Sequence, residues 1–286
     1  MNNIVISPHK LESIMICPRL YYFKYILNYT TSFTPKYFLE GEFFHSLLED
    51  YYTDIKKNRK QDIPFYLEIA RNKAAIFNKP GIELDELEYL VGIFKQYLEY
   101  YNNETTWKVI GTETPFIKEL WSGKVGDQEV RILLQGKADL LIEKGTIPII
   151  VDHKVVSQNR GFISRVNQNL AYLWALGYSD FIINSIGKQK TLSPDKKFLR
   201  EYFNYSPYQI EEWKGIAIET VLELVNYHSQ SHFPARYTGC SFHGNKCSFY
   251  DVCETSNDNW AYKLESNYII QEDYQASYFP KEETPQ

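Results

Sequence analysis

Three strand-sized segments follow one another between residues 129 and 152, and they constrain the fold more than any other part of the chain. Each is six or seven residues long and either alternates apolar with polar residues or is almost continuously apolar. Lys144-Gly145 separates the last two and is typical of a hairpin turn. Helical periodicity precedes this cluster over 37–103 and returns over 163–176. The order predicts an α/β core that carries a helical insertion over 37–103.

Further signals extend this pattern to both sides of the strand cluster. Ser7-Pro8 predicts the start of a helix, with the hydroxyl as cap and proline in the first turn. Strands are predicted over 178–184 and 198–205, and Ser206-Pro207 opens a helix of about 20 residues. We expect one domain over residues 1–253, followed by an acidic tail over 254–286.

Composition excludes several classes of protein. The 286 residues are 44% hydrophobic and 16% aromatic, which is too apolar for a disordered chain. The longest apolar runs are strand-sized, so no membrane contact is expected. The N-terminus lacks the features of a secretory signal. We therefore expect a cytoplasmic protein, of a bacterium or of the host cell if a phage encodes it.

The formal net charge of −5 at pH 7 argues at first against a nucleic-acid partner. Residues 254–286 carry two basic and seven acidic side chains, a balance of −5, so the rest of the chain is neutral. Within that neutral part, residues 187–200 hold five basic side chains and one acidic side chain. Two interpretations of this run stay open: a track that contacts nucleic acid, and an ordinary solvated loop.

Charged residues lie near the ends of two neighbouring predicted strands. Asp152 and Lys154 are two positions apart, so their side chains leave the same face of the sheet, and Asp139 on the preceding strand can meet them. Two carboxylates suit Mg²⁺ or Mn²⁺, and a lysine beside them can orient water and stabilise charge on a phosphate. The set fits metal-assisted phosphodiester hydrolysis, although an Asp and a Lys so spaced are more often an ordinary surface pair.

The surrounding residues resemble the PD-(D/E)XK nuclease superfamily, in its RecB-like branch. Gly136 and Asp139 match the family's G-x-x-D, and residues 152–154 match its hydrophobic-D-Y-K with His153 in place of the usual tyrosine. The resemblance implies a restriction-endonuclease-like core with a mixed central sheet flanked by helices. It also implies a metal-dependent deoxyribonuclease, in the form of an exonuclease on single-stranded or end-bearing DNA that works in DNA repair or recombination.

Further motifs carry the same resemblance. Gln168 and Tyr172 match the family's Q-x-x-x-Y and share a helical face. Residues 41–45 resemble the family's helix with a metal-binding histidine, His45, and Glu49 lies one turn further on the same face. Glu113 resembles part of a family strand, and no role is assigned to it.

The resemblance assigns a role to each of these residues. Asp139 and Asp152 would bind the Mg²⁺ or Mn²⁺ ion, with the carbonyl of His153 as a third ligand, and His45 would bind at a second metal site or tune the first. Lys154 would position the attacking water. Two further residues, Gln168 and Tyr172, would hold the DNA strand or the geometry of the site. By spacing alone, His45 would instead be a core histidine, and Tyr172 could equally pack in the core.

The chain has four cysteines, and three of them lie within fourteen residues. Thiols grouped in this way in a cytoplasmic protein favour a metal site over disulfides, and four thiolates suit a [4Fe–4S] cluster or tetrahedral zinc. His243 could replace one thiolate at a zinc site. Four ordinary buried cysteines are the simpler alternative. The candidate ligands are Cys17, Cys240, Cys247 and Cys253.

The placement of Cys17-Pro18 before the core and of three cysteines after it is similar to the iron–sulfur subgroup of RecB-like nucleases, the AddB and CRISPR-associated exonuclease type. That resemblance implies a [4Fe–4S] cluster that joins the two ends of the chain as a structural staple. DNA is the implied partner, together with other recombination or replication proteins.

Two alternatives from other classes remain. One is a catalytically inactive DNA-binding or assembly module that keeps the nuclease fold. The other is a zinc-stapled protein with no role on nucleic acid. The intact set of Asp139, Asp152 and Lys154 argues against the first, because a binding module has no need of a water-activating lysine. The sequence has no P-loop, so we expect no ATPase motor in this chain.

Overall fold

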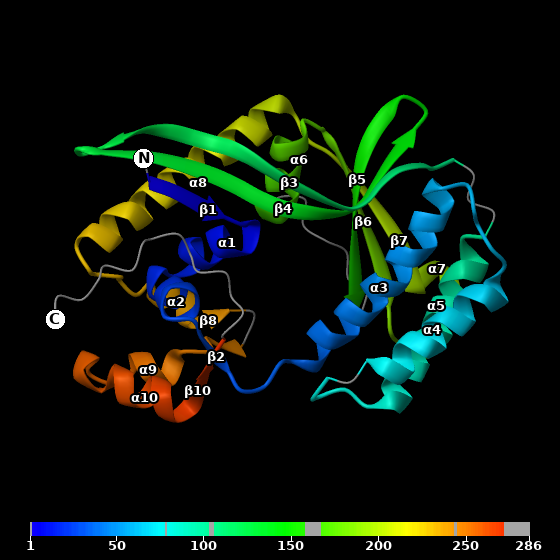
Figure 1. Ribbon diagram of the computed structural model, residues 1–286, viewed down its shortest axis with the longest axis horizontal. Coiled ribbons are helices and arrows are strands. Elements are labelled where there is room, and N and C mark those ends of the chain that lie inside the picture. Colours follow the sequence, from blue (N-terminus) through cyan, green and yellow to red (C-terminus); the bar gives the residue numbers. More distant parts are fainter. Residues whose placement is uncertain (1, 78, 103–105, 158–166, 243–244, 272–286) are drawn as a thin grey trace. The chain divides into compact units, whose positions relative to one another are not determined.

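The structure, a computed structural model, describes residues 2–77, 79–102, 106–157, 167–242 and 245–271 (Figure 1). The chain forms two compact units that alternate along the sequence. The first unit contains Met1–Ser32, Ile117–Gly136 and Ile210–Gln286. The second contains Phe33–Phe116 and Lys137–Gln209. The candidate catalytic residues all belong to the second unit, and the four cysteines all belong to the first.

Six strands form the main sheet. They are β1 (Asn2–Ile6), β3 (Lys108–Val125), β4 (Gln128–Lys144), β5 (Ile147–Val156), β6 (Asp180–Gly187) and β7 (Phe198–Asn204). The strand order is β1-β4-β5-β6-β7, and β3 also pairs with β4. β1–β4 and β5–β6 are parallel, whereas β4–β5 and β6–β7 are antiparallel. The predicted α/β architecture with a mixed sheet is confirmed.

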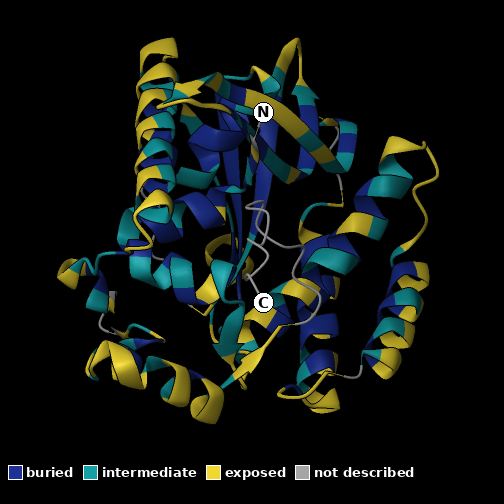
Figure 2. Ribbon diagram, turned by 60° about the vertical axis from the view of Figure 1, so that its left-hand side comes forward, coloured by how far each residue is buried: buried dark blue, intermediate teal, exposed yellow. Residues whose placement is uncertain are grey.

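The helices of the second unit cover its part of the sheet. They are α3 (Lys36–Lys56), α4 (Ile63–Ile76), α5 (Leu84–Tyr100), α6 (Asn167–Leu176) and α7 (Pro194–Lys197). α3 packs on β5 and α6 packs on β6, from opposite sides in Figure 1. Every residue of β6 is buried, and dark blue strands run through the middle of the sheet in Figure 2. A strand buried on both faces is the environment expected for the centre of an α/β sheet.

Local signals explain where these helices begin. The Asp62 side chain caps α4 by accepting a hydrogen bond of 3.0 Å from the backbone N–H of Phe65. Glu83 and Glu86 form a capping box at the start of α5. The predicted apolar stripes of 37–103 are buried against one another, and Phe44 of α3 meets Phe94 of α5 edge to face. These contacts build the core of the second unit.

The first unit is assembled from both ends of the chain. Its elements are α1 (Pro8–Ile16), α2 (Pro18–Tyr21), the π-helical η1 (Tyr22–Ile26), β2 (Tyr29–Thr31), α8 (Pro207–Ser229), η2 (Tyr237–Cys240), β8 (Ser241–Phe242), β9 (Asn245–Lys246), α9 (Tyr250–Cys253), η3 (Asn257–Asn259), α10 (Trp260–Asn267) and β10 (Tyr268–Ile270). Ser7 caps α1 as predicted, accepting from the Lys10 N–H at 3.3 Å. A small core joins Phe23 to Phe249, Val252 and Leu264.

The structure corrects the sequence analysis at several elements. The segments 129–135 and 137–143 are one continuous strand, β4. β1, and the β2–β10 pair, were not predicted. In the basic run, Lys197 is buried and donates to Gln96, and Lys188 pairs with Glu40. The run is therefore not a continuous exposed track. Of the acidic tail, residues 272–286 lie outside the described residues.

No helix among the described residues combines the length and apolar character needed to cross a bilayer.

Gly239 in η2 makes a close approach that a side chain would prevent. A Cβ at this position would lie 2.7 Å from the backbone oxygen of Ile16. We expect Gly239→Ala to lower the free energy of unfolding by about 1–3 kcal/mol, because backbone must move to relieve the overlap. Chemical denaturation measures this change. Gly215→Ala in α8 is the matched control, since its Cβ meets no atom within 4 Å and should be neutral or stabilising.

Candidate active site

The β4–β5 hairpin brings the two predicted carboxylates together. The antiparallel register pairs Leu140 with Val151, and Asp139 and Asp152 are the next residue on each strand. Asp152 is buried, with 2% of its surface exposed. The backbone N–H of His153 donates to Oδ2 of Asp139 at 2.9 Å. The hairpin predicted from Lys144-Gly145 thus sets the spacing of the acidic pair.

Helix α3 places His45 beside Asp139. Nε2 of His45 lies 2.8 Å from the carbonyl oxygen of His153, and Nδ1 lies 3.5 Å from Oδ2 of Asp139. A carbonyl oxygen only accepts, so Nε2 carries the proton in this contact. In the neutral ring, Nδ1 then keeps its lone pair and directs it toward Asp139. The same contact occupies one of the two lone pairs of the His153 carbonyl.

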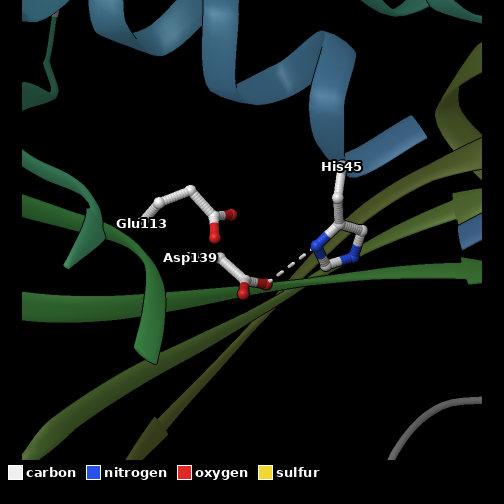
Figure 3. Close-up of side chains that lie close together, drawn as sticks. All are labelled: His45, Glu113 and Asp139. Carbon is white, nitrogen blue, oxygen red and sulfur yellow. Dashed lines mark ion pairs between the residues drawn. The ribbon is translucent and has the colours of Figure 1, made fainter. Parts of the chain in front are cut away.

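Glu113, to which the sequence motifs assign no role, completes a group of three candidate metal ligands. Ligand atoms of His45, Glu113 and Asp139 all lie within 4.8 Å of one another. Figure 3 shows the three side chains converging, from α3 and from two strands. Glu113 has a φ of +44° within β3, a conformation that is strained for a residue with a side chain. Its carboxylate pairs with Lys137.

The backbone conformation of Glu113 is the signal that the sequence could not supply. Nothing in the residues 113–116 marks a left-handed residue inside a strand. Strained residues that the fold holds in place are concentrated at functional sites. The strain is therefore consistent with a carboxylate that is aimed at His45 and Asp139.

A second group links Asp152 to helix α6. Nζ of Lys154 lies 2.8 Å from Oδ2 of Asp152 and donates to Oε1 of Gln168 at 3.2 Å. The Gln168 amide donates to Oδ1 of Asp152 at 2.9 Å, and its distance to the Tyr172 hydroxyl is 3.3 Å. Gln168 therefore bridges the acid and the lysine. Tyr172 packs edge to face on Phe116, so it combines contact with the site and packing.

A buried polar layer supports the site from behind. The His153 ring stacks on Tyr52 with centroids 5.6 Å apart, and its Nδ1 lies 2.8 Å from the Asn184 amide nitrogen. Asn184 also donates to Tyr97, whose hydroxyl lies 2.6 Å from that of Tyr52. Burial holds the pKa of His153 well below its usual range, and electrostatic interactions with His45, Arg200 and Lys154 lower it further. A neutral imidazole can therefore fill the position where the family pattern has tyrosine.

The site opens into a cleft of about 500 Å³ within the second unit. Its wall includes four carboxylates, and two lysines are the cationic side chains among the described lining residues. The carboxylates are Glu42, Glu49, Glu113 and Asp139, and the lysines are Lys137 and Lys154. An anionic phosphodiester would meet net negative charge in this cleft unless a cation were bound there.

Burial and, after it, the neighbouring Asp152 together raise the pKa of Asp139 to about 6, against the opposing effects of His45, the His153 N–H and Lys154. Oδ2 of Asp152 is buried and, apart from its ion pair with Lys154, receives no hydrogen bond. A divalent cation would relieve both conditions. Carboxylate oxygens with one imidazole nitrogen suit Mn²⁺ or Mg²⁺, so the residues present fit such an ion.

The four cysteines belong to a separate part of the chain. Burial raises the pKa of the Cys247 thiol, and Cys17 and Cys240 contribute to the rise. Burial likewise raises the pKa of Cys253, to which Cys247 and Cys17 contribute. Among the described residues, however, the thiols form no group with sulfur atoms within 4.8 Å of one another, so they are not clustered around a single-ion site. His243 lies outside the described residues.

Residues 5–254 match the PD-(D/E)XK nuclease superfamily. The match covers most of the chain, so the protein belongs to this superfamily, and its mixed sheet flanked by helices is the restriction-endonuclease-like fold. Members of this class are nucleases that use divalent metal ions, in agreement with the acidic cleft. No curated protein matches the chain.

Several solved structures share part of the fold. A candidate exonuclease from Eubacterium rectale superposes with a TM-score of 0.47 at 12% identity, over 87% of each chain. LHK-Exo, solved in complex with dAMP, gives a TM-score of 0.32 at 11% identity, over 67% of this chain and 97% of its own. SSO0001 gives 0.30 at 14% identity, over 65% and 84%. These likenesses are too loose to bear on the chemistry of the site.

The raised pKa of Asp139 gives a test of metal binding. Because this carboxyl is protonated below about pH 6, protons compete with the metal there. We expect Mn²⁺ to raise the Tm by several degrees at pH 7.5 and by much less at pH 5. Asp139→Asn should abolish the rise. Differential scanning calorimetry at both pH values measures it.

The metal-free protein provides the complementary result. A folded-state pKa above the unfolded value means that this group weakens the fold as the pH rises through about 6. Asp139→Asn should therefore raise the Tm of metal-free protein at pH 8, and this gain should shrink at pH 5. Asp127→Asn, at an exposed turn, is the control and should change neither result.

Proposed function

We propose that the protein is a metal-dependent deoxyribonuclease of the RecB-like branch, an exonuclease acting on single-stranded or end-bearing DNA in the cytoplasm. The observation that carries this proposal is the convergence of His45, Glu113 and Asp139 in the cleft that also holds Lys154. Membership of the nuclease superfamily supports the reaction class. DNA as the substrate, the RecB-like branch and partners in recombination or replication rest on the resemblance of the sequence motifs.

The bound metal ion would supply charge neutralisation at the phosphate and a water of lowered pKa. His45, Glu113 and Asp139 lie close enough together to hold it, and Asp152, which lies outside that group beside Lys154, is the further carboxylate that we assign to it. The His153 N–H fixes the orientation of the Asp139 carboxylate. Its carbonyl fixes the tautomer of His45, so that Nδ1 faces the carboxylates.

Lys154 is the group that we assign to the attacking water. Its ammonium is held by Asp152 and Gln168 at 2.8 and 3.2 Å on the wall of the cleft, where it can orient a water in line with the phosphorus. The same positive charge stabilises the negative charge that develops on the phosphate oxygens. Gln168 then acts by holding the side chains of Lys154 and Asp152 in fixed positions relative to each other. Tyr172 supports Gln168 from the same helical face.

Lys154→Ala should lower the rate of phosphodiester cleavage by about 10²- to 10⁴-fold, because the water loses its orienting group. The measurement is cleavage of end-labelled single- and double-stranded DNA with Mg²⁺ or Mn²⁺. Affinity for DNA, measured with Ca²⁺ to prevent cleavage, should be nearly unchanged. Lys108→Ala, an exposed lysine paired with Glu143, is the control and should cleave as the wild type does.

The outcome also decides between the two leading functions. A variant that cleaves at the wild-type rate would show that Lys154 is not part of the active site. A folded, metal-loaded wild type that cleaves no DNA but binds it would favour the inactive DNA-binding or assembly module.

We also propose that Cys17, Cys240, Cys247 and Cys253 hold a [4Fe–4S] cluster. All four belong to the first unit. Cys17 and Cys240 contribute to the raised pKa of Cys247, and Cys17 and Cys247 contribute to that of Cys253. A single tetrahedral zinc ion would need sulfur atoms about 3.8 Å apart, given Zn–S bonds of about 2.3 Å. A four-iron cluster is larger than one ion and takes thiolates that stand further apart. The separation of the described thiols is compatible with the larger cluster, whose choice over zinc rests on the resemblance of the sequence motifs.

Protein purified without oxygen should be brown and should absorb broadly in the visible range, with about four iron atoms per chain. Cys247→Ser should lose most of this absorbance and iron and lower the Tm, while a colourless protein with one zinc would contradict the cluster. Wild-type protein that contains neither iron nor zinc would indicate that the four cysteines are ordinary buried thiols. Iron and zinc analysis of the same sample separates these results.

A further inference from the structure

One face of α3 lines the cleft from its mouth to the candidate metal ligands. Tyr37, Gly41, His45 and Glu49 follow one another at intervals of four residues, so they lie along one side of the helix. Phe38 joins this face next to Tyr37. The helix therefore presents an aromatic pair, a glycine and a candidate metal ligand in that order.

The aromatic pair is exposed although the chain has a large core to bury it in. Tyr37 and Phe38 are each 60% exposed, and their ring centroids lie 4.5 Å apart. Isolated exposed aromatics are ordinary on a protein surface. Two adjacent rings at the opening of a cleft lined by carboxylates need a different account, because each ring offers an apolar face to whatever enters.

Gly41 is the second observation, and it is independent of the first. Glycine inside a helix lowers stability relative to alanine, so a helical glycine usually has a packing reason. Here a Cβ would meet no atom within 4 Å, so packing within the fold does not require glycine at this position. The space lies between the aromatic pair and His45 on the cleft wall. It is the room that a bound molecule would occupy.

Charge points to the way in which that molecule is held. The described lysines that line the cleft, Lys137 and Lys154, pair with Glu113 and Asp152. At the mouth, Glu42 pairs with Lys79. This end of the cleft thus offers no excess positive charge to a phosphate backbone. Affinity near Tyr37 and Phe38 must come from contact with an aromatic or apolar surface.

We propose that this face of α3 is a nucleotide subsite that selects an unpaired strand. It rests on the nuclease function proposed above and specifies its substrate. Tyr37 and Phe38 stack on a nucleobase, Gly41 leaves room for the sugar and phosphate, and the next phosphate lies at the metal ion that His45, Glu113 and Asp139 would hold. A base inside a duplex has both faces stacked on its neighbours, so only an unpaired or terminal base can offer a free face to these rings.

The first test removes the base rather than the protein side chain. Single-stranded oligothymidylate is compared with versions that carry one tetrahydrofuran abasic residue at successive positions. For wild type, an abasic residue at one position beside the cleaved bond should lower kcat/KM by about 10- to 100-fold. The Tyr37→Ala/Phe38→Ala variant should lose the same factor on the intact strand and should be insensitive to the abasic residue. Phe65→Ala, an exposed aromatic of α4 outside the cleft, should match wild type.

The second test fills the space at Gly41. Gly41→Leu should lower kcat/KM at least 10-fold while the Tm stays equal or rises, because leucine favours the helix and obstructs the cleft. Gly92→Leu is the matched control: Gly92 lies exposed in α5, its Cβ would also meet no atom within 4 Å, and it is not in the cleft. It should show the gain in Tm with wild-type cleavage.

The outcomes separate the subsite from the nuclease. If wild type cleaves but the double variant keeps both its rate and its sensitivity to the abasic residue, the subsite is wrong and the nuclease stands. If wild type cleaves nothing, binding of the same strands in Ca²⁺ decides the subsite. Binding weakened by Tyr37→Ala/Phe38→Ala but not by Phe65→Ala would retain it without the enzyme, and equal binding by all three proteins would overturn it.

Discussion

Two carboxylates, Asp139 and Asp152, lie on adjacent strands of one hairpin, and Asp152 is buried while the Asp139 side chain is 12% exposed. Their repulsion is opposed by a backbone N–H, by Lys154 and by the Gln168 amide, each supplied by a different position of the second unit. The arrangement stores unfavourable charge in the metal-free protein. Such charge is what a divalent cation would neutralise, so stability and metal affinity are two aspects of the same pair.

The contacts of His153 explain how the fold holds these two carboxylates in position. His153 is fixed by its backbone to Asp139 and His45, and by its ring to Tyr52 and Asn184. One residue thus connects the reactive surface to a buried layer of aromatic and amide groups. A tyrosine hydroxyl would need another partner in this layer, whereas a neutral imidazole accepts the hydrogen bond that Asn184 offers.

The sequence predicts the hairpin, the helices and most of the candidate site because these depend on local periodicity and on motif order. Asp152 and Lys154 share a face by strand geometry alone. The long-range contacts are different: β1 pairs with β4 across more than a hundred residues, and no local signal marks it. Glu113 was missed for a related reason, since its role depends on a left-handed φ and on partners from other elements. The assigned roles of these residues remain predictions.

The alternation of the two units along the chain has a consequence for how such a protein can be altered. Three of the boundaries between the units fall inside β3, β4 and α8. No single cut in the sequence therefore releases either unit whole, and a protease acting on exposed loops would not separate them. Because neither unit is one continuous segment, the cysteine-bearing unit cannot be added to or removed from the chain as a single terminal cassette without dividing those three elements.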